Sequence, residues 1–111
     1  MAGKQRLLVA DDSLTIQKVI RLALSSEDFE IQTASNGEEA SQQIALFRPQ
    51  IVLIDASLPG KTAFEIKEEV NLLDEGDSTQ FVLMTTSYDN VDPLESDRLG
   101  FAAKVSKPFD P

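Results

Sequence analysis

Short apolar runs alternate with longer amphipathic segments along the chain. Mostly apolar runs begin at Leu7, Ile51, Phe81 and Phe101, and Phe29–Ala34 alternates apolar with polar residues, as a half-buried edge strand does. Each stretch between these runs repeats apolar residues at helical spacing. Such alternation is typical of βαβ units, so the sequence predicts an α/β domain with a parallel sheet.

Local signals predict the limits of each element. Ser13 and Asn36 are good N-caps, Thr62 opens the third helix, Pro93 suits the first turn of the fourth, and Gly100 ends it. We expect strands at Leu7–Ala10, Phe29–Ala34, Gln50–Ile54, Gln80–Thr85 and Phe101–Val105. We expect helices from Ser13 to about Ser25, after Asn36, from Thr62, and over Asp89–Leu99, with loops at 56–61 and 74–78.

Helical spacing also selects apolar stripes. The stripes consist of Ile16, Val19, Ile20 and Ala23 in the first helix, Ala40, Ile44 and Phe47 in the second, and the candidate core residues Phe64, Ile66, Val70 and Leu73 in the third. Gln50–Ile54 ends in four apolar residues, which predicts a central strand covered on both faces. Five strands alternate with only four helices, and a missing fifth helix would leave the first helix alone on its face. We therefore expect residues 1–111 to be one domain cut from a longer protein before its last helix, unless a neighbouring chain covers that face.

Composition excludes several classes of function. The 111 residues contain no cysteine and no histidine, which rules out disulfides, thiolate metal sites and histidine catalysis. The net charge of −9 argues against direct binding of nucleic acid and favours a basic protein surface or a divalent cation. No apolar run approaches membrane-spanning length, and the N-terminus does not resemble a signal peptide.

Polar residues follow the apolar runs where the predicted strands end. They are Asp11, Asp12, Asp55, Thr86 and Lys107. The carboxyl ends of parallel strands share one edge of the sheet, where α/β folds bind ligands. We therefore expect one pocket that offers three carboxylates to a divalent cation, a hydroxyl group, and an ammonium for an anion.

Each of these residues also has an ordinary structural explanation. Asp11 and Asp12 could cap a helix, although two adjacent carboxylates repel each other and Mg²⁺ would relieve that repulsion. Asp55 could be a turn residue or an acid paired with a nearby lysine, or it could carry a phosphoryl group as a nucleophile. Thr86 could be a plain strand residue or a phosphoryl contact, and Lys107 a solvated lysine or a counter-ion. The combination at successive strand ends favours the functional explanation.

The chain resembles the receiver domain of bacterial two-component response regulators, the CheY-like family. The resemblance covers nearly the whole chain and rests on Leu8–Ser13, Pro49–Pro59, Val82–Ser87 and Lys107–Phe109. It implies a flavodoxin-like, doubly wound five-stranded parallel sheet in the order 2-1-3-4-5, without the last helix. It also implies a cytoplasmic signalling switch rather than an enzyme.

The family pattern implies a role for each matching residue. Asp55 would be the phosphoacceptor, and Mg²⁺ would be bound by Asp11, Asp12, Asp55 and the carbonyl of Ser57. Lys107, Thr86 and the backbone N–H groups of Ala56 and Ser87 would contact the phosphoryl group. The donor would be a phosphohistidine on a histidine kinase or phosphotransfer protein, since this chain has no histidine.

Three positions depart from the family pattern. Thr62-Ala63 stands where Asp-Gly or Ser-Gly is usual, and Lys104 replaces the aromatic residue that normally moves with Thr86. Tyr88, with Ser57, would border the path of the hydrolytic water and tune the rate of dephosphorylation. The relay would then run through the face of the fourth helix and fifth strand, including Thr86 and Lys104, to an output domain or protein. The family also allows a homodimer.

Three other functions are open to the same fold. A receiver-like module could bind a partner without phosphorylation, but the complete set of Asp55, Thr86 and Lys107 argues against it. An aspartyl phosphatase generally needs a general acid two residues after its nucleophile, where this chain has Ser57. A flavodoxin-like cofactor site needs a phosphate-binding loop after the first strand, where Asp11 and Asp12 would repel phosphate.

Overall fold

Five parallel strands form one sheet in the order β2-β1-β3-β4-β5 in the computed structural model, which describes residues 5–73, 79–86 and 91–107. The strands are β1 Gln5–Ala10, β2 Phe29–Ala34, β3 Ile51–Asp55, β4 Gln80–Thr85 and β5 Ala103–Ser106. The helices are α1 Leu14–Ala23, α2 Gly37–Phe47, α3 Ala63–Asn71 and α4 Pro93–Leu99. The predicted doubly wound sheet and its strand order are therefore confirmed.

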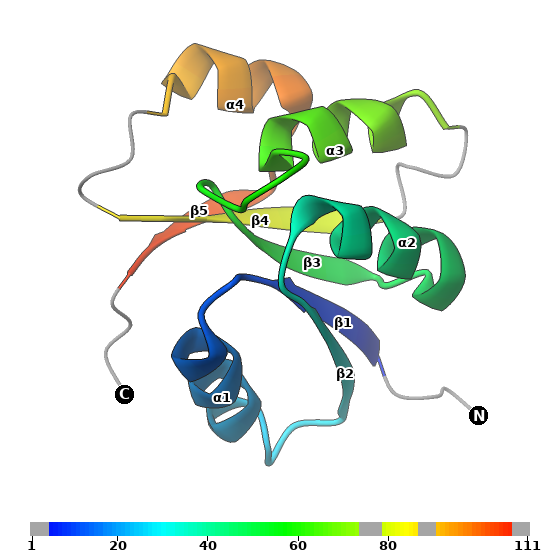
Figure 1. The fold of residues 1–111 in the computed structure, drawn as a ribbon, viewed down its shortest axis with the longest axis vertical. Coiled ribbons are helices and arrows are strands. Elements are labelled where there is room, and N and C mark those ends of the chain that lie inside the picture. Colours follow the sequence, from blue (N-terminus) through cyan, green and yellow to red (C-terminus); the bar gives the residue numbers. More distant parts are fainter. Residues whose placement is uncertain (1–4, 74–78, 87–90, 108–111) are drawn as a thin grey trace.

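The helices lie unequally on the two faces of the sheet. Within the described residues, α1 lies alone on one face, whereas α2, α3 and α4 cover the other (Figure 1). The expectation that the first helix would be alone on its face is borne out. The larger apolar core lies under α2 and α3, and the smaller one lies between the sheet and α1.

Strand alternation divides the apolar side chains between these two cores. In β1, Leu8 belongs to the larger core and Leu7 and Val9 to the smaller one, so this strand is covered on both faces. In β3, only the apolar side chains that face the larger core are fully buried. Ile54 is buried there, whereas Leu53 on the α1 side is only half-buried, so coverage of both faces was overpredicted for this strand.

Predicted caps define the starts of three helices. The side chains of Ser13, Asn36 and Thr62 accept hydrogen bonds from backbone N–H groups in the first turns of α1, α2 and α3. Thr62 forms a full capping box with Glu65. These caps stabilise the turns that follow β1, β2 and β3.

Several predicted limits were wrong. Strand β1 begins at Gln5 rather than Leu7, and β3 is Ile51–Asp55 rather than Gln50–Ile54. Helix α1 ends at Ala23, before Ser25. Strand β5 begins at Ala103 because Phe101 packs its ring edge-on against Phe64 and Phe81 instead of joining the strand ladder. Helix α4 begins at Pro93, after its N-cap Asp92, rather than at Asp89. The predicted loop 74–78 lies outside the described residues.

Several predicted core residues lie at the surface. Leu73 is 60% exposed, and Val19 and Ala23 are exposed as well. In their place, two polar residues are buried: Gln17 in α1 and Lys67 in α3. Among the described residues, no helix has the length and apolar character needed to span a membrane.

The first turn of α2 touches the loop that follows β3. The Gly37 N–H donates to the Pro59 carbonyl at 2.9 Å, and the Lys61 N–H donates to Glu38 Oε2 at 2.9 Å. A Cβ atom at position 37 would lie 1.9 Å from the Lys61 carbonyl oxygen. Only glycine allows this approach of two backbones.

Gly37→Ala should therefore lower the free energy of unfolding by about 2 kcal/mol, because overpacking against backbone outweighs the better helix propensity of alanine. Urea unfolding followed by circular dichroism would measure the change. Gln42→Ala, at an exposed position of the same helix, is the control and should change the free energy by less than about 0.5 kcal/mol. A Gly37→Ala protein as stable as this control would contradict the close contact.

Candidate functional site

Three carboxylates meet at the carboxyl ends of β1 and β3. One oxygen each from Asp11, Asp12 and Asp55 lies within 4.8 Å of the others. Asp11 and Asp55 are buried, with 0% and 2% of their surface exposed, whereas Asp12 is exposed. The cluster thus has two buried members and one that faces solvent.

Lys107 brings a positive charge to the two buried carboxylates. Its Nζ lies 2.9 Å from Asp11 Oδ2 and 3.4 Å from Asp55 Oδ1. The backbone positions it, because the Lys107 N–H donates to the Thr85 carbonyl at 2.7 Å and so extends the pairing of β5 with β4. A lysine far along the sequence thereby reaches the ends of β1 and β3.

The pKa of Lys107 is raised above its ordinary value. Burial alone lowers this pKa, but the hydrogen bond that Lys107 donates to Asp11 and the charges of Asp55 and Asp11 outweigh burial. Lys107 therefore stays protonated at neutral pH. Its stabilising contribution is present there and is lost only as the pH rises through the raised pKa.

Local hydrogen bonds fix the two buried carboxylates. The Ser13 N–H donates to Asp11 Oδ1 at 2.9 Å, and Gln17 Nε2 donates to the Asp11 carbonyl at 2.7 Å. The N–H and the hydroxyl of Ser57 both donate to Asp55 Oδ1 at 3.1 Å. In the part of the chain that the structure describes, every side-chain contact of Asp55 falls on Oδ1, so Oδ2 is free of donors.

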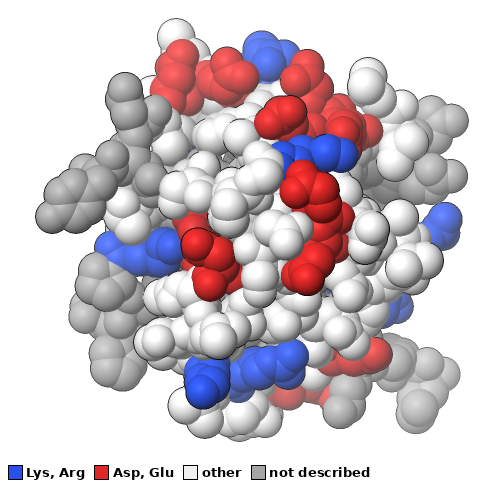
Figure 2. Space-filling view, in the orientation of Figure 1, with Lys and Arg blue, Asp and Glu red and all other residues white. Residues whose placement is uncertain are grey.

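The cluster is suited to a divalent cation. Three carboxylates and one ammonium sum to a formal charge of −2 (−3 plus 1). Carboxylate oxygens are the ligands that Mg²⁺ prefers, and a divalent ion would offset the remaining charge. Elsewhere on the molecule, acidic side chains gather over α2, α3 and α4, whereas α1 carries basic ones (Figure 2).

The remaining predicted residues lie around this cluster or outside the described residues. Thr86 directly follows β4 and is half-buried, and Lys104 is exposed on β5. The Ala56 N–H donates to the Met84 carbonyl at 2.8 Å, so the sheet already uses this predicted phosphoryl donor. Ser87 and Tyr88 lie outside the described residues.

Three hydrogen-bond donors of the site, from two residues, were not predicted from the sequence. The Ser57 N–H and hydroxyl hold Asp55, although Ser57 was expected to offer only its carbonyl and to border the water path. Gln17 supports the end of β1 from within α1. A serine two residues after a strand-end aspartate is typical of a turn in which the serine donates back to the carboxylate. That spacing could have indicated the two bonds from Ser57 to Asp55.

The model of the response regulator receiver domain family matches residues 7–111 of the chain. Sporulation initiation phosphotransferase F of Bacillus subtilis is 30% identical over 107 residues, which cover 96% of this chain and 84% of that protein. The DNA-binding response regulator MtrA of Mycobacterium tuberculosis is 28% identical over 97% of this chain, but the chain spans only 46% of MtrA.

Solved structures show the same fold. The chemotaxis response regulator CheY4 of Vibrio cholerae matches with a TM-score of 0.87 and 26% identity, over 98% of this chain and 91% of that chain. A putative response regulator of Chloroflexus aurantiacus matches with a TM-score of 0.86 and 27% identity, over 98% and 89%. Both are similar to this chain in sequence as well as in fold.

Lys107→Ala should lower the free energy of unfolding by about 3 kcal/mol in the presence of a chelator, because Asp11 and Asp55 would remain buried without a counter-ion. Mg²⁺ should restore a large part of this loss, since a bound cation can replace the ammonium. Urea unfolding with Mg²⁺ and with EDTA measures both effects.

The control for this experiment is Lys18→Ala, at an exposed position of α1. It should change the free energy of unfolding by less than about 0.5 kcal/mol, with no added response to Mg²⁺. The charge balance described above would be refuted by a Lys107→Ala protein that behaves like Lys18→Ala in both buffers.

Proposed function

Because this chain belongs to the response regulator receiver domain family, we propose that it is a phosphorylation-dependent switch whose phosphoacceptor is Asp55. The observation that carries this proposal is the one-sided bonding of the Asp55 carboxylate. Ser57 and Lys107 hold Oδ1, while Oδ2 has no donor within the described residues. A fixed carboxylate with one free oxygen is positioned as a nucleophile.

The phosphoryl group comes from a phosphohistidine of a histidine kinase or a histidine phosphotransfer protein. Asp55 Oδ2 forms the new O–P bond as the P–N bond of the donor breaks, and the departing imidazole takes up a proton. The chain has no histidine, so the donor is another protein or a small phosphodonor. Catalysis consists mainly of orientation and charge neutralisation.

The residues around Asp55 divide the remaining tasks. Asp11, Asp12, Asp55 and the Ser57 carbonyl would hold Mg²⁺, which supplies positive charge to the transferring phosphoryl oxygens. Lys107 offsets the negative charge that the phosphoryl group adds.

Two further donors complete the phosphoryl contacts. The Thr86 hydroxyl and the Ser87 N–H donate to the remaining phosphoryl oxygens. Ala56 can join them only if its N–H leaves the Met84 carbonyl. The Ser57 N–H is already beside Asp55 and serves more directly.

The response spreads from Thr86 to the face formed by α4 and β5. Asp92, Arg98 and Lys104 lie on these elements, and Lys104 is exposed on β5. An exposed lysine is strongly hydrated, so its role is to change the charge presented to a partner rather than to enter the core as an aromatic ring would. The local charge change at Asp55 thereby shifts a population between two states of this surface.

The partners follow from this role and from the charge of the domain. They are the kinase or phosphotransfer protein and an output domain or protein, with a homodimer as one form of output. The domain does not bind nucleic acid itself, since its net charge of −9 opposes a polyanion. It works in the cytoplasm and has no catalytic turnover beyond its own phosphorylation and slow dephosphorylation.

Incubation with acetyl phosphate and Mg²⁺ should add one phosphoryl group to the wild-type protein and none to Asp55→Ala, as measured by intact-mass spectrometry. EDTA should abolish the adduct. Asp28→Ala removes an exposed carboxylate at the far end of the sheet and should leave phosphorylation unchanged. A folded, Mg²⁺-binding wild-type protein that forms no adduct would instead indicate a receiver-like binding module that works without phosphorylation.

Tyr88→Ala should shorten the lifetime of the phosphorylated protein by about threefold to tenfold, because a bulky residue here would shield the aspartyl phosphate from water. The decay of the phosphoprotein mass after removal of the donor measures this lifetime. Tyr88→Phe keeps the bulk of the ring and should decay like the wild type. Equal lifetimes for Tyr88→Ala and Tyr88→Phe would refute the shielding role.

A further inference from the structure

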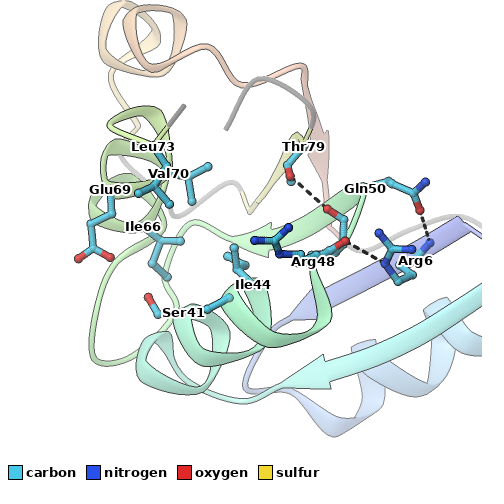
Figure 3. Close-up of a pocket in the computed structure, with 12 residues that line it drawn as sticks. Arg6, Ser41, Ile44, Arg48, Gln50, Ile66, Glu69, Val70, Leu73 and Thr79 are labelled. Atoms are coloured by element: carbon cyan, nitrogen blue, oxygen red, sulfur yellow. Dashed lines mark hydrogen bonds between the residues drawn. The ribbon is translucent and has the colours of Figure 1, made fainter. Parts of the chain in front are cut away.

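A second hollow lies at the opposite edge of the sheet from Asp55. It is a cavity of about 700 Å³ between α2 and α3, and it reaches the amino ends of β1, β3 and β4 (Figure 3). A strand of five residues separates the cavity from the carboxylate cluster, and the length of such a strand is roughly 16 Å at the usual rise per residue. Its volume falls in the range of small-molecule sites.

One wall of this cavity is apolar. Ile44 from α2 and Ile66 and Val70 from α3 point into it (Figure 3). Ile66 and Val70 are buried and belong to the larger core. The apolar body of a ligand placed here would extend an existing core rather than lie on a polar surface.

The other wall carries two arginines. Arg6 Nε donates to the carbonyls of Phe47 and Arg48, both at 2.9 Å, which fixes this side chain against the end of α2. In Figure 3 the Arg48 guanidinium extends toward Ile44 across the cavity. Within the described residues, neither arginine forms an ion pair, although the chain carries 19 acidic residues.

The backbone at Arg48 is strained for a residue that carries a side chain. Arg48 caps α2 in the left-handed conformation, with φ of 51° and ψ of 61°. Glycine is the usual residue at this position, and a side chain there is strained by about 1 kcal/mol. A positive charge at the C-terminal end of α2 interacts favourably with the helix dipole, and the same charge is available to an anion in the cavity.

Two further observations define the polarity of the cavity. Glu69 lines it, but Lys61 Nζ lies 2.8 Å from Glu69 Oε2 and balances that charge, so the net charge of the wall is positive. The Ser41 hydroxyl oxygen is buried at the same cavity and has no hydrogen-bond partner among the described residues. Because this oxygen is closed off from water, it does not face the open part of the cavity and is not counted among the ligand contacts.

We propose that this cavity binds a small amphipathic carboxylate, such as an acyl or aryl acid. Its apolar body lies against Ile44, Ile66 and Val70, and its carboxylate lies at Arg48 and Arg6. A planar guanidinium matches a carboxylate in a two-point hydrogen bond, which favours this head group. The site is independent of phosphorylation at Asp55.

The probe for this site is decanoate, followed through the methyl signals of the wild-type protein in ¹H–¹³C NMR spectra. The largest shifts should fall on Ile44, Ile66 and Val70. Decanol has the same body without the charge, and acetate has the charge without the body, so both should bind at least about tenfold more weakly than decanoate. An apolar site alone would bind decanol as well as decanoate.

Three variants separate the contributions of charge and space. Arg48→Gly should weaken decanoate binding by about tenfold, keep decanol binding within about twofold, and fold at least as well as the wild type because it removes the strained side chain. Ser41→Leu fills the cavity and should weaken both ligands. Arg21→Gln changes an exposed arginine on α1, the opposite side of the sheet, and should change neither.

The proposal is overturned by any of three results. Decanoate could fail to shift these methyl signals at millimolar concentration, it could shift those next to α1 instead, or it could bind Arg48→Gly as tightly as the wild type. Thermal unfolding of each variant shows that its fold is retained. Phosphorylation by acetyl phosphate provides a separate measurement that this site should not affect.

Discussion

The contact of Lys107 with Asp11 and Asp55 is the interaction on which the arrangement of this domain depends. Two carboxylates with almost no exposure lie at the ends of adjacent strands, and each repels the other. One ammonium, 2.9 Å from the first and 3.4 Å from the second, offsets part of that repulsion. The lysine reaches them because β5 pairs with β4 and β4 with β3, so the site requires β1, β3, β4 and β5 together.

The two edges of the sheet carry local charges of opposite sign. At the carboxyl edge an excess of negative charge remains after Lys107 is counted, which suits a cation and an incoming phosphoryl group. At the amino edge, Arg6 binds the last carbonyls of α2, which would otherwise lack partners, and Arg48 leaves positive charge beside apolar side chains. A chain with a strong negative net charge thus keeps one locally positive hollow.

The sequence predicted the sheet well because strand ends and caps are local signals. The alternation of β2, the caps Ser13, Asn36 and Thr62, and the convergence of the strand-end carboxylates with Lys107 all follow from short stretches of residues. Their chemical roles remain predictions.

The sequence predicted the rotation of the helices poorly. The buried face of helix α1 is offset from its apolar stripe, so spacing alone could not show that Gln17 turns inward to bond the Asp11 carbonyl while Val19 turns outward. Leu73 was misjudged because α3 ends at Asn71, before the stripe reaches it. The cavity between α2 and α3 depends on how two separate helices pack, which no short stretch encodes.

The contact of Gly37 with the loop after β3 means that the two sides of the site are held by different kinds of contact. On the side of α2, the backbone of Gly37 packs against the backbone of Lys61, and the Lys61 N–H donates to Glu38. On the other side, β5 is a short strand whose residues are all exposed and which, among the described strands, pairs with β4 alone. Within the described residues, the Gly37 side of the rim is therefore held by contacts between the first turn of α2 and a loop, whereas the β5 side is held by one neighbouring strand.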